Sequence, residues 1–200
     1  MLEIKLKNGQ ISRNDFSIII SHLKNDRVLI LPTDTIYGLS CRGTSIKGIK
    51  KIKQLKKRGD DKPFIILVDG LKMAKKYVFL SDNQEKKLKE IWFKNRPTTI
   101  ILKHRHLLPR ILTGKFDSLA LRLPKSKILI KIIKELGEPI ISTSLNLSGQ
   151  KNLSDPSEFD KYFFLKNKAK LIVNSGKCRR KKASRLVDLS EEGKITILRK

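Results

Sequence analysis

Short apolar runs alternate along this chain with segments whose apolar residues recur at helical spacing. The runs Val28–Leu31, Phe64–Val68 and Thr99–Leu102 are predicted as buried strands, because each is continuous and too short for a helix. Residues 14–24 and 46–55 instead carry apolar side chains three or four residues apart, which predicts amphipathic helices. This alternation, without internal repeats or low-complexity linkers, predicts an α/β fold with a twisted, mixed parallel and antiparallel open sheet flanked by helices.

The remaining segments extend the same pattern. Further helices are predicted over residues 71–78, 82–93 and 126–136, and further strands over 119–123, 139–143, 171–173, 185–188 and 195–198. The expected helix caps are Asn14 or Asp15, Thr44 or Ser45, Gly59 at a C-terminus, and a capping box at 155–158. Residues 174–183 are predicted to form a mobile basic loop. We expect residues 1–200 to be a single domain with a core of about residues 10–198.

The strand Val28–Leu31 runs directly into the polar segment Pro32–Leu39. That segment places the hydroxyls of Thr33 and Thr35, the carboxylate of Asp34 and the phenol of Tyr37 at a strand end. Strand ends of open α/β sheets are where ligand-binding groups gather. By itself the segment indicates only a polar turn. It becomes evidence for a ligand site together with two later segments.

The first of these is a cluster of cations. Lys56 and Arg58 lie two residues apart at a helix end, and Lys62 follows closely. Arginine offers phosphate a two-pronged hydrogen-bonding group and lysine offers a point charge, so the cluster can hold a triphosphate. The structural alternative is that these cations stabilise the C-terminal end of the helix dipole.

The second is the segment Ser142–Gly149, which follows a predicted buried strand. It holds four hydroxyls and Asn146 within seven residues, all of them neutral partners for phosphate, ribose or adenine. The alternative is an ordinary turn whose Ser and Asn side chains bond their own backbone. Together, the three segments predict a site for a phosphorylated ligand and a small polar one.

Other nucleotide and catalytic motifs are absent from the sequence. It contains neither GxxxxGK[ST] nor GxGxxG, so a nucleotide would have to be held in another way. No Ser/His/Asp or Cys/His arrangement is apparent, and His104 and His106 have no acidic or cysteine partners at ligand spacing. Asp34, Asp60 and Asp61 could share a magnesium ion, but no side-chain cluster defines a metal site. Asp60 and Asp61 could equally lie in a solvated loop.

Charge and cysteine content indicate which partners and which cellular compartment to expect. The 45 Lys and Arg residues against 19 Asp and Glu give a net charge of +26, which suggests a phosphate-bearing partner or simply a lysine-rich solvated surface. Two separate cysteines and the absence of long apolar segments or a signal peptide predict a cytoplasmic protein that does not span a membrane.

The three segments, in this order, resemble the YrdC family, and in particular its short bacterial branch of TsaC-type threonylcarbamoyl-AMP synthases. The resemblance rests on Pro-Thr-Asp-Thr-x-Tyr-Gly-Leu from Pro32, Lys-x-Arg at Lys56, and Ser-x-Asn-x-Ser-Gly from Ser144. Leu112–Arg122 also matches that branch, and the likeness covers about residues 10–198. It implies a YrdC-like fold.

The resemblance also implies a function and partners. A nucleotidyltransferase of this family makes threonylcarbamoyl-adenylate and pyrophosphate from L-threonine, bicarbonate or CO2, and ATP, usually with Mg²⁺. This is the first step of threonylcarbamoyl modification of the tRNA adenosine next to the anticodon. Proteins of the TsaB, TsaD and TsaE type then transfer the group, and tRNA could bind the basic surface directly.

Residue by residue, the resemblance makes Lys56 and Arg58 the catalytic residues. The implied nucleotide-binding residues are Lys56, Arg58, Lys62, Ser118, Thr143, Ser144, Asn146 and Ser148. The implied threonine- and bicarbonate-binding residues are Thr33, Thr35, Tyr37, Arg122 and Ser184. No side chain is required to form a covalent intermediate.

The chain departs from the family pattern at several positions. Leu67 stands where many members carry a threonine-contacting histidine, which leaves open how threonine is held. Leu145 replaces a common alanine, Gly59 replaces a proline, and the usual Pro-Gly-Pro turn appears as Asn95-Arg96-Pro97. The alternative function is a non-catalytic module that binds double-stranded RNA or tRNA.

Overall fold

The computed structural model describes residues 2–6, 9–59, 62–94, 96–155, 158, 169–178 and 183–200. Asp60, Asp61 and Asn95 lie outside the described residues, as do Pro156 and Ser157 of the predicted capping box and the basic run 179–182.

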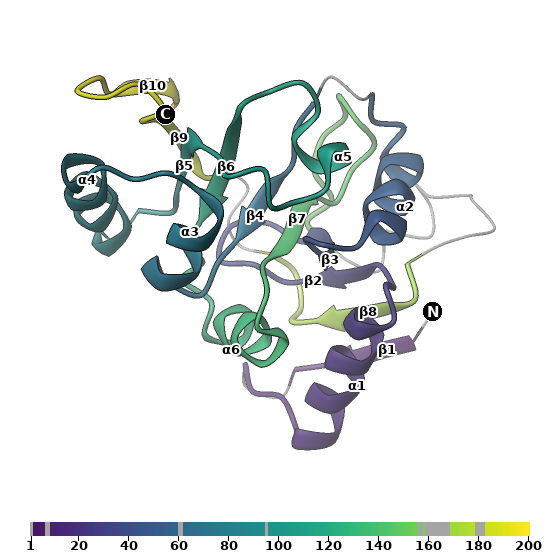
Figure 1. Ribbon diagram of the computed structural model, residues 1–200. Coiled ribbons are helices and arrows are strands. Elements are labelled where there is room, and N and C mark those ends of the chain that lie inside the picture. Colours follow the sequence, from purple (N-terminus) through teal and green to yellow (C-terminus); the bar gives the residue numbers. More distant parts are fainter. Residues whose placement is uncertain are drawn as a thin grey trace.

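The described chain alternates strands and helices, as the sequence predicted (Figure 1). The helices are α1 (Arg13–Lys24), α2 (Ile46–Lys56), α3 (Leu71–Tyr77), α4 (Asp82–Phe93), α5 (Arg110–Thr113) and α6 (Lys127–Leu136). The strands are β1 (Leu2–Lys5), β2 (Leu29–Leu31), β3 (Gly38–Arg42), β4 (Ile65–Leu67), β5 (Thr98–Lys103), β6 (Ser118–Arg122), β7 (Ile140–Ser144), β8 (Leu171–Asn174), β9 (Arg185–Asp188) and β10 (Thr196–Arg199). The elements β1, β3 and α5 were not predicted.

Two predicted helix caps are wrong. The N-cap of α1 is Ser12, whose hydroxyl accepts from the backbone N–H of Asp15, so neither Asn14 nor Asp15 caps it. The C-cap of α2 is Lys57, which has the left-handed conformation (φ 49°) and lies two residues before Gly59. Ser45, one of the two predicted candidates, caps α2. Ser81 and Ser126 cap α4 and α6, and Gly137 ends α6 with φ 68°.

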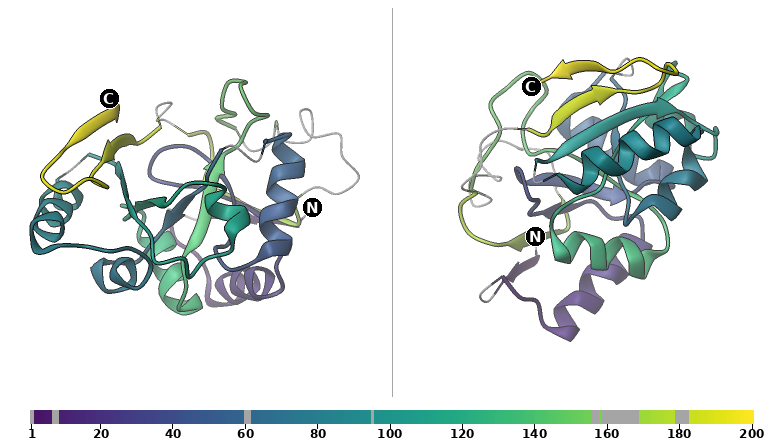
Figure 2. Two further views of the ribbon diagram at one scale, coloured as in Figure 1. Left: turned by 45° about the horizontal axis from the view of Figure 1, so that its top comes forward. Right: turned by 90° about the vertical axis from the view of Figure 1, so that its left-hand side faces the viewer.

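Within the described residues, all strands join one mixed sheet in the order β1-β8-β2-β3-β7-β4-β6-β5-β9-β10. The pairs β1/β8, β2/β8, β4/β6 and β5/β9 are parallel, and the pairs β2/β3, β3/β7, β4/β7, β5/β6 and β9/β10 are antiparallel. The sheet twists from β1 at one edge to β10 at the other (Figure 2). This confirms the predicted mixed α/β fold.

Successive side chains of each strand point to opposite faces of the sheet, and each face has its own apolar core. Ile30, Ile66 and Ile141 pack in the core that contains the buried stripes of α2, α3 and α4. Leu31, Leu67 and Ile140 pack instead in the core that contains α1 and α6. Helices α1 and α6 lie side by side over this second face (Figure 1).

Helix α2 packs very closely on β3. A Cβ atom at Gly48 would lie 2.7 Å from Cys41 Sγ and 2.8 Å from Cys41 Cβ. Cys41 is fully buried at this contact, and burial raises the pKa of its thiol far above the ordinary value. Cys41 is therefore a packing residue, and its contact with Gly48 holds the first turn of α2 against β3.

Candidate functional site

A cavity of about 370 Å³ opens over the sheet face that carries Leu67. Leu67 also belongs to the core with α1 and α6, so the cavity continues the face that these two helices cover only in part. Strands β3, β4, β5, β6, β7 and β9 contribute Gly38, Ile65, Leu67, Ile101, Ala120, Arg122, Ser142, Thr143, Ser144 and Leu186 to its lining. The segment 33–37, Arg58, Pro63, Phe64, Ala183, Ser184 and Arg199 complete the described lining. The three sequence segments thus meet at one site.

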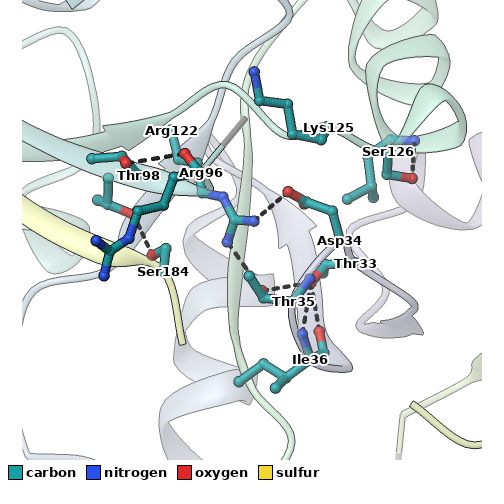
Figure 3. A network of polar contacts seen from close by, with 12 residues as sticks. Thr33, Asp34, Thr35, Ile36, Arg96, Thr98, Arg122, Lys125, Ser126 and Ser184 are labelled. Carbon is teal, nitrogen blue, oxygen red and sulfur yellow. Dashed lines mark hydrogen bonds and ion pairs between the residues drawn. The ribbon is translucent and has the colours of Figure 1, made fainter. Parts of the chain in front are cut away.

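The segment after β2 is folded around the hydroxyl of Thr33. Its Oγ1 accepts from the backbone N–H groups of Thr35 (3.0 Å) and Ile36 (3.1 Å) and donates to the Ile36 carbonyl (2.6 Å). Thr33 Oγ1 also lies 2.9 Å from Thr35 Oγ1. Thr33 therefore shapes the turn that presents Asp34 and Thr35 to the cavity (Figure 3).

Arg122 lies between the two side chains presented by that turn (Figure 3). Its Nη2 is 2.7 Å from Asp34 Oδ2, and its Nη1 donates to Thr35 Oγ1 at 3.1 Å. The Arg122 and Asp34 side chains are only 7% and 10% exposed. Arg122 Nε and Asp34 Oδ1 are buried and make no hydrogen bond to any residue that the structure describes. A buried donor without a partner in a cavity wall can bind an anionic or carbonyl oxygen of a ligand.

The wall beside Arg122 comes from the C-terminal strands. Ser184 is buried, and its hydroxyl lies 2.7 Å from the Thr99 hydroxyl of β5. Arg199 of β10 donates from Nε to the Ser184 carbonyl at 2.8 Å and lines the same cavity. Partial burial and the neighbouring Arg122 lower the pKa of Arg199. The sequence analysis missed Arg199, because only the pairing of β10 beside β9 brings the end of the chain to the cavity.

Arg58 lines the opposite end of the cavity. Its guanidinium donates to the carbonyls of Lys62 (3.1 Å) and Pro63 (2.7 Å), and its Cζ lies 4.7 Å from the centre of the Phe64 ring. These contacts hold the guanidinium in the cavity wall. The side chain of Lys62 is exposed beside it and is not part of the cavity lining.

Lys56 is placed differently from Arg58. Its side chain is buried, and its ammonium contacts the loop after β7 at the Ser144 carbonyl, the Asn146 carbonyl and Asn146 Oδ1. Burial, and secondarily the charge of Arg58, lower the pKa of Lys56 to about 7. Lys56 and Asn146 are therefore brought together, but neither is among the residues that line the cavity.

Tyr37 is among the residues that line the cavity, but its side chain packs in the core that contains α2, α3 and α4, and its hydroxyl bonds another segment. The hydroxyl donates to the Gly176 carbonyl (2.7 Å), accepts from the Ser175 N–H (2.9 Å) and lies 2.8 Å from Ser175 Oγ. Burial raises the pKa of Tyr37, so the phenol stays neutral. Cys178 Sγ donates to the Thr35 carbonyl at 3.1 Å. These bonds tie the chain after β8 to the Pro32–Leu39 segment.

Strand β7 adds Ser142, Thr143 and Ser144 to the residues that line the cavity. A Cβ atom at Gly38 would lie 2.2 Å from Ser142 Oγ, so the glycine gives Ser142 its space. Of the other predicted nucleotide residues, Ser118 begins β6 and Ser148 lies in the loop held by Lys56, and both are outside the cavity lining.

The structure also bears on metal and membrane binding. The described residues contain no group of three or more His, Cys, Asp or Glu side chains that could hold a metal ion. His104 is buried, with its Nε2 3.1 Å from the Phe116 carbonyl and its Nδ1 accepting from the His106 N–H at 3.2 Å. Among the helices that the structure describes, none is long and apolar enough to cross a bilayer.

Comparison with known proteins identifies what this arrangement resembles. The Sua5/YciO/YrdC family model, described as "Telomere recombination", matches residues 21–200. The chain is 34% identical over 134 residues to the threonylcarbamoyl-AMP synthase of Klebsiella pneumoniae, an alignment that covers 66% of this chain and 70% of the relative.

Solved structures match the fold over nearly the whole chain. A P. abyssi Sua5 variant superposes with a TM-score of 0.88 at 25% identity over 99% of this chain. This chain spans 59% of that Sua5 chain. E. coli YciO superposes with a TM-score of 0.83 at 25% identity, with 100% of this chain and 94% of YciO covered.

Proposed function

This chain belongs to the Sua5/YciO/YrdC family, and we propose that it is a threonylcarbamoyl-AMP synthase. The proposed reaction converts L-threonine, bicarbonate or CO2, and ATP into threonylcarbamoyl-adenylate and pyrophosphate. The observation that carries the proposal is the convergence of the Pro32–Leu39 turn, Arg58 and the β7 hydroxyls on one cavity. A relative that aligns over two thirds of the chain is named for this activity.

The two ends of the cavity suit the two halves of the reaction. Arg122, Thr35 and Ser184 supply a buried cation and hydroxyls at one end, which fits a small zwitterion and a carbonate group. Arg58 supplies a cation at the other end, which fits a triphosphate. We therefore place threonine and bicarbonate beside Thr33, Thr35, Tyr37, Arg122 and Ser184.

We place ATP along Arg58, Lys62 and the strand and loop that carry Ser144. The nucleotide set of the proposal is Lys56, Arg58, Lys62, Ser118, Thr143, Ser144, Asn146 and Ser148. Lys56 and Asn146 belong to it through the loop after β7. Mg²⁺ would enter with ATP, bound to its phosphates.

The proposed chemistry requires positioning and charge stabilisation rather than a covalent nucleophile. The threonine amine adds to CO2 and loses a proton, and a carbamate oxygen then attacks the α-phosphorus. The bond from the α-phosphorus to the bridging oxygen breaks, and pyrophosphate leaves. Negative charge grows on phosphoryl oxygens in this step, and fixed cations such as Arg58 stabilise it.

The proposal extends to the cellular setting. It makes this chain a cytoplasmic nucleotidyltransferase of one domain, which delivers its product to TsaB-, TsaD- and TsaE-type proteins for transfer to tRNA. The sheet that runs continuously from β1 to β10 supports the single domain.

Pyrophosphate release from ATP tests the function. We expect release only when threonine and bicarbonate are both present, and we expect Arg58→Ala or Lys56→Ala to abolish it. Lys50→Ala, which removes an exposed cation from the same α2, is the matched control and should retain activity. Release at the same low rate without threonine, with tight duplex RNA binding at about 150 mM salt, would overturn the synthase proposal in favour of an RNA-binding module.

A further inference from the structure

Lys56 is the last residue of α2, and both its backbone and its side chain contact the loop after β7. Its carbonyl accepts from the Ser148 N–H at 2.9 Å. Its ammonium lies 2.5 Å from the Ser144 carbonyl, 2.8 Å from the Asn146 carbonyl and 2.6 Å from Asn146 Oδ1. The lysine side chain is 1% exposed.

An ammonium group has three N–H donors and no acceptor. Three short contacts to oxygen atoms of the loop therefore match its full donor capacity. Ser144 Oγ is farther away, at 3.5 Å. A phosphate could take one of these hydrogens only by displacing a loop oxygen, which would then be buried without a donor at a cost of about 1–3 kcal/mol.

The loop is built around this ammonium. Asn146 accepts from Lys56 and from Ser144 Oγ (2.6 Å) at Oδ1, and its Nδ2 donates to the Gln150 carbonyl at 2.5 Å. Leu145, between the two lysine-bonded residues, is fully buried and donates its N–H to the Tyr37 carbonyl at 3.0 Å. The Lys56 ammonium thus lies among the oxygen atoms of Ser144 and Asn146, whose partial negative charges would otherwise repel one another in a buried position.

We infer that Lys56 is a positioning residue, which shapes the Ser144–Gln150 loop and affects the nucleotide through that loop rather than by binding phosphate. The inference deepens the proposed function and relies on it for the identity of the nucleotide. Arg58, two residues later, differs in that its guanidinium lines the cavity. The two cations of the Lys-x-Arg pair therefore have separate roles.

Chemical reactivity of the lysines in the ligand-free wild-type protein tests the inference directly. Acetic anhydride labelling followed by mass spectrometry should leave Lys56 at least about tenfold less reactive than exposed Lys57, with or without ATP. If Lys56 reacts as readily as Lys57 without ATP and is protected by ATP, it is a phosphate ligand and the inference is wrong.

A variant provides a second test. Lys56→Met removes the three loop contacts, so amide hydrogen exchange within 144–150 should accelerate about tenfold or more in ligand-free protein. Arg58→Ala, the matched control, should leave that exchange unchanged. Unchanged exchange in Lys56→Met would overturn the inference, and protected amides in β4 and β6 establish that the variant is folded.

Nucleotide binding separates the two roles further. Lys56→Met should weaken AMP and ATP binding by the same factor, whereas Arg58→Ala should weaken ATP binding more. A loss confined to ATP in Lys56→Met would contradict the inference. The labelling and exchange measurements need no turnover, so they still decide the role of Lys56 if the synthase proposal fails.

Discussion

Arg122 Nη2 lies 2.7 Å from Asp34 Oδ2 in the wall of the cavity, and the two side chains come from β6 and from the turn after β2. The residues are 88 positions apart in the sequence numbering (122 minus 34). Their pairing orients the guanidinium so that Nη1 meets Thr35 while Nε keeps no described partner. The ion pair therefore stabilises the turn and also sets the orientation of the Arg122 guanidinium in the cavity wall.

Asp34→Asn should destabilise the protein. It leaves the buried Arg122 cation without its anion, which typically costs about 3–5 kcal/mol of unfolding free energy. Urea unfolding followed by circular dichroism measures the loss. The double variant Asp34→Asn/Arg122→Met should recover part of it, because neither charge then remains buried. A single variant within about 0.5 kcal/mol of wild type would contradict the interpretation.

Arg122→Lys should weaken threonine use selectively. Lysine keeps the charge but lacks the planar group that reaches Asp34 and Thr35 together and offers Nε to a ligand. We expect the threonine KM to rise about tenfold or more, while the ATP KM changes less than about threefold. Steady-state pyrophosphate release at varied threonine and varied ATP measures both. An equal rise in the two constants would place Arg122 outside the threonine end.

Tyr37→Phe should affect stability more than substrate binding. The variant keeps the ring in the core that contains α2, α3 and α4 but removes the hydroxyl that bonds Ser175 and Gly176. Loss of these bonds should lower the unfolding free energy by about 1–3 kcal/mol. The threonine KM should change far less than in Arg122→Lys. A larger KM effect than that of Arg122→Lys would mean that the hydroxyl contacts threonine.

The unfolding free energy should depend on pH through the titration of Lys56. Folding lowers the pKa of Lys56 from its ordinary value of 10.5 to about 7. Between these two values the unfolded chain binds more protons than the folded one, so a rise in pH favours the folded state. The unfolding free energy of wild type relative to Lys56→Met should therefore increase as the pH is raised from about 7 towards 10.

Urea unfolding of both proteins at matched pH values measures this difference. Lys50→Met removes an exposed lysine of α2 and serves as the control. Its unfolding free energy should differ from that of wild type by the same amount at every pH. A flat difference for Lys56→Met as well would mean that Lys56 keeps its ordinary pKa in the folded protein.

Local sequence patterns were sufficient to predict most of the elements. Continuous apolar runs predicted β2, β4 and β5, and helical spacing predicted α1, α2 and α6, because burial of one face determines these patterns. Strand β3 was missed because its Gly38 and Ser40 lie on the cavity side, where small and polar residues replace the usual apolar ones. The signal that could have found it is the alternation of Leu39 and Cys41 with them.

Local patterns in the sequence were enough to predict the fold class and the three segments that meet at the cavity. Which side chains face the cavity depends on strand order and register, and these arise from long-range packing that no local pattern contains. The tertiary structure paired Arg122 with Asp34, brought Arg199 from the last strand to Ser184, and turned the Lys56 ammonium towards a loop that a linear motif cannot orient. A sequence motif specifies which residue types occur at a site, but long-range packing sets whether each side chain points into the cavity or away from it.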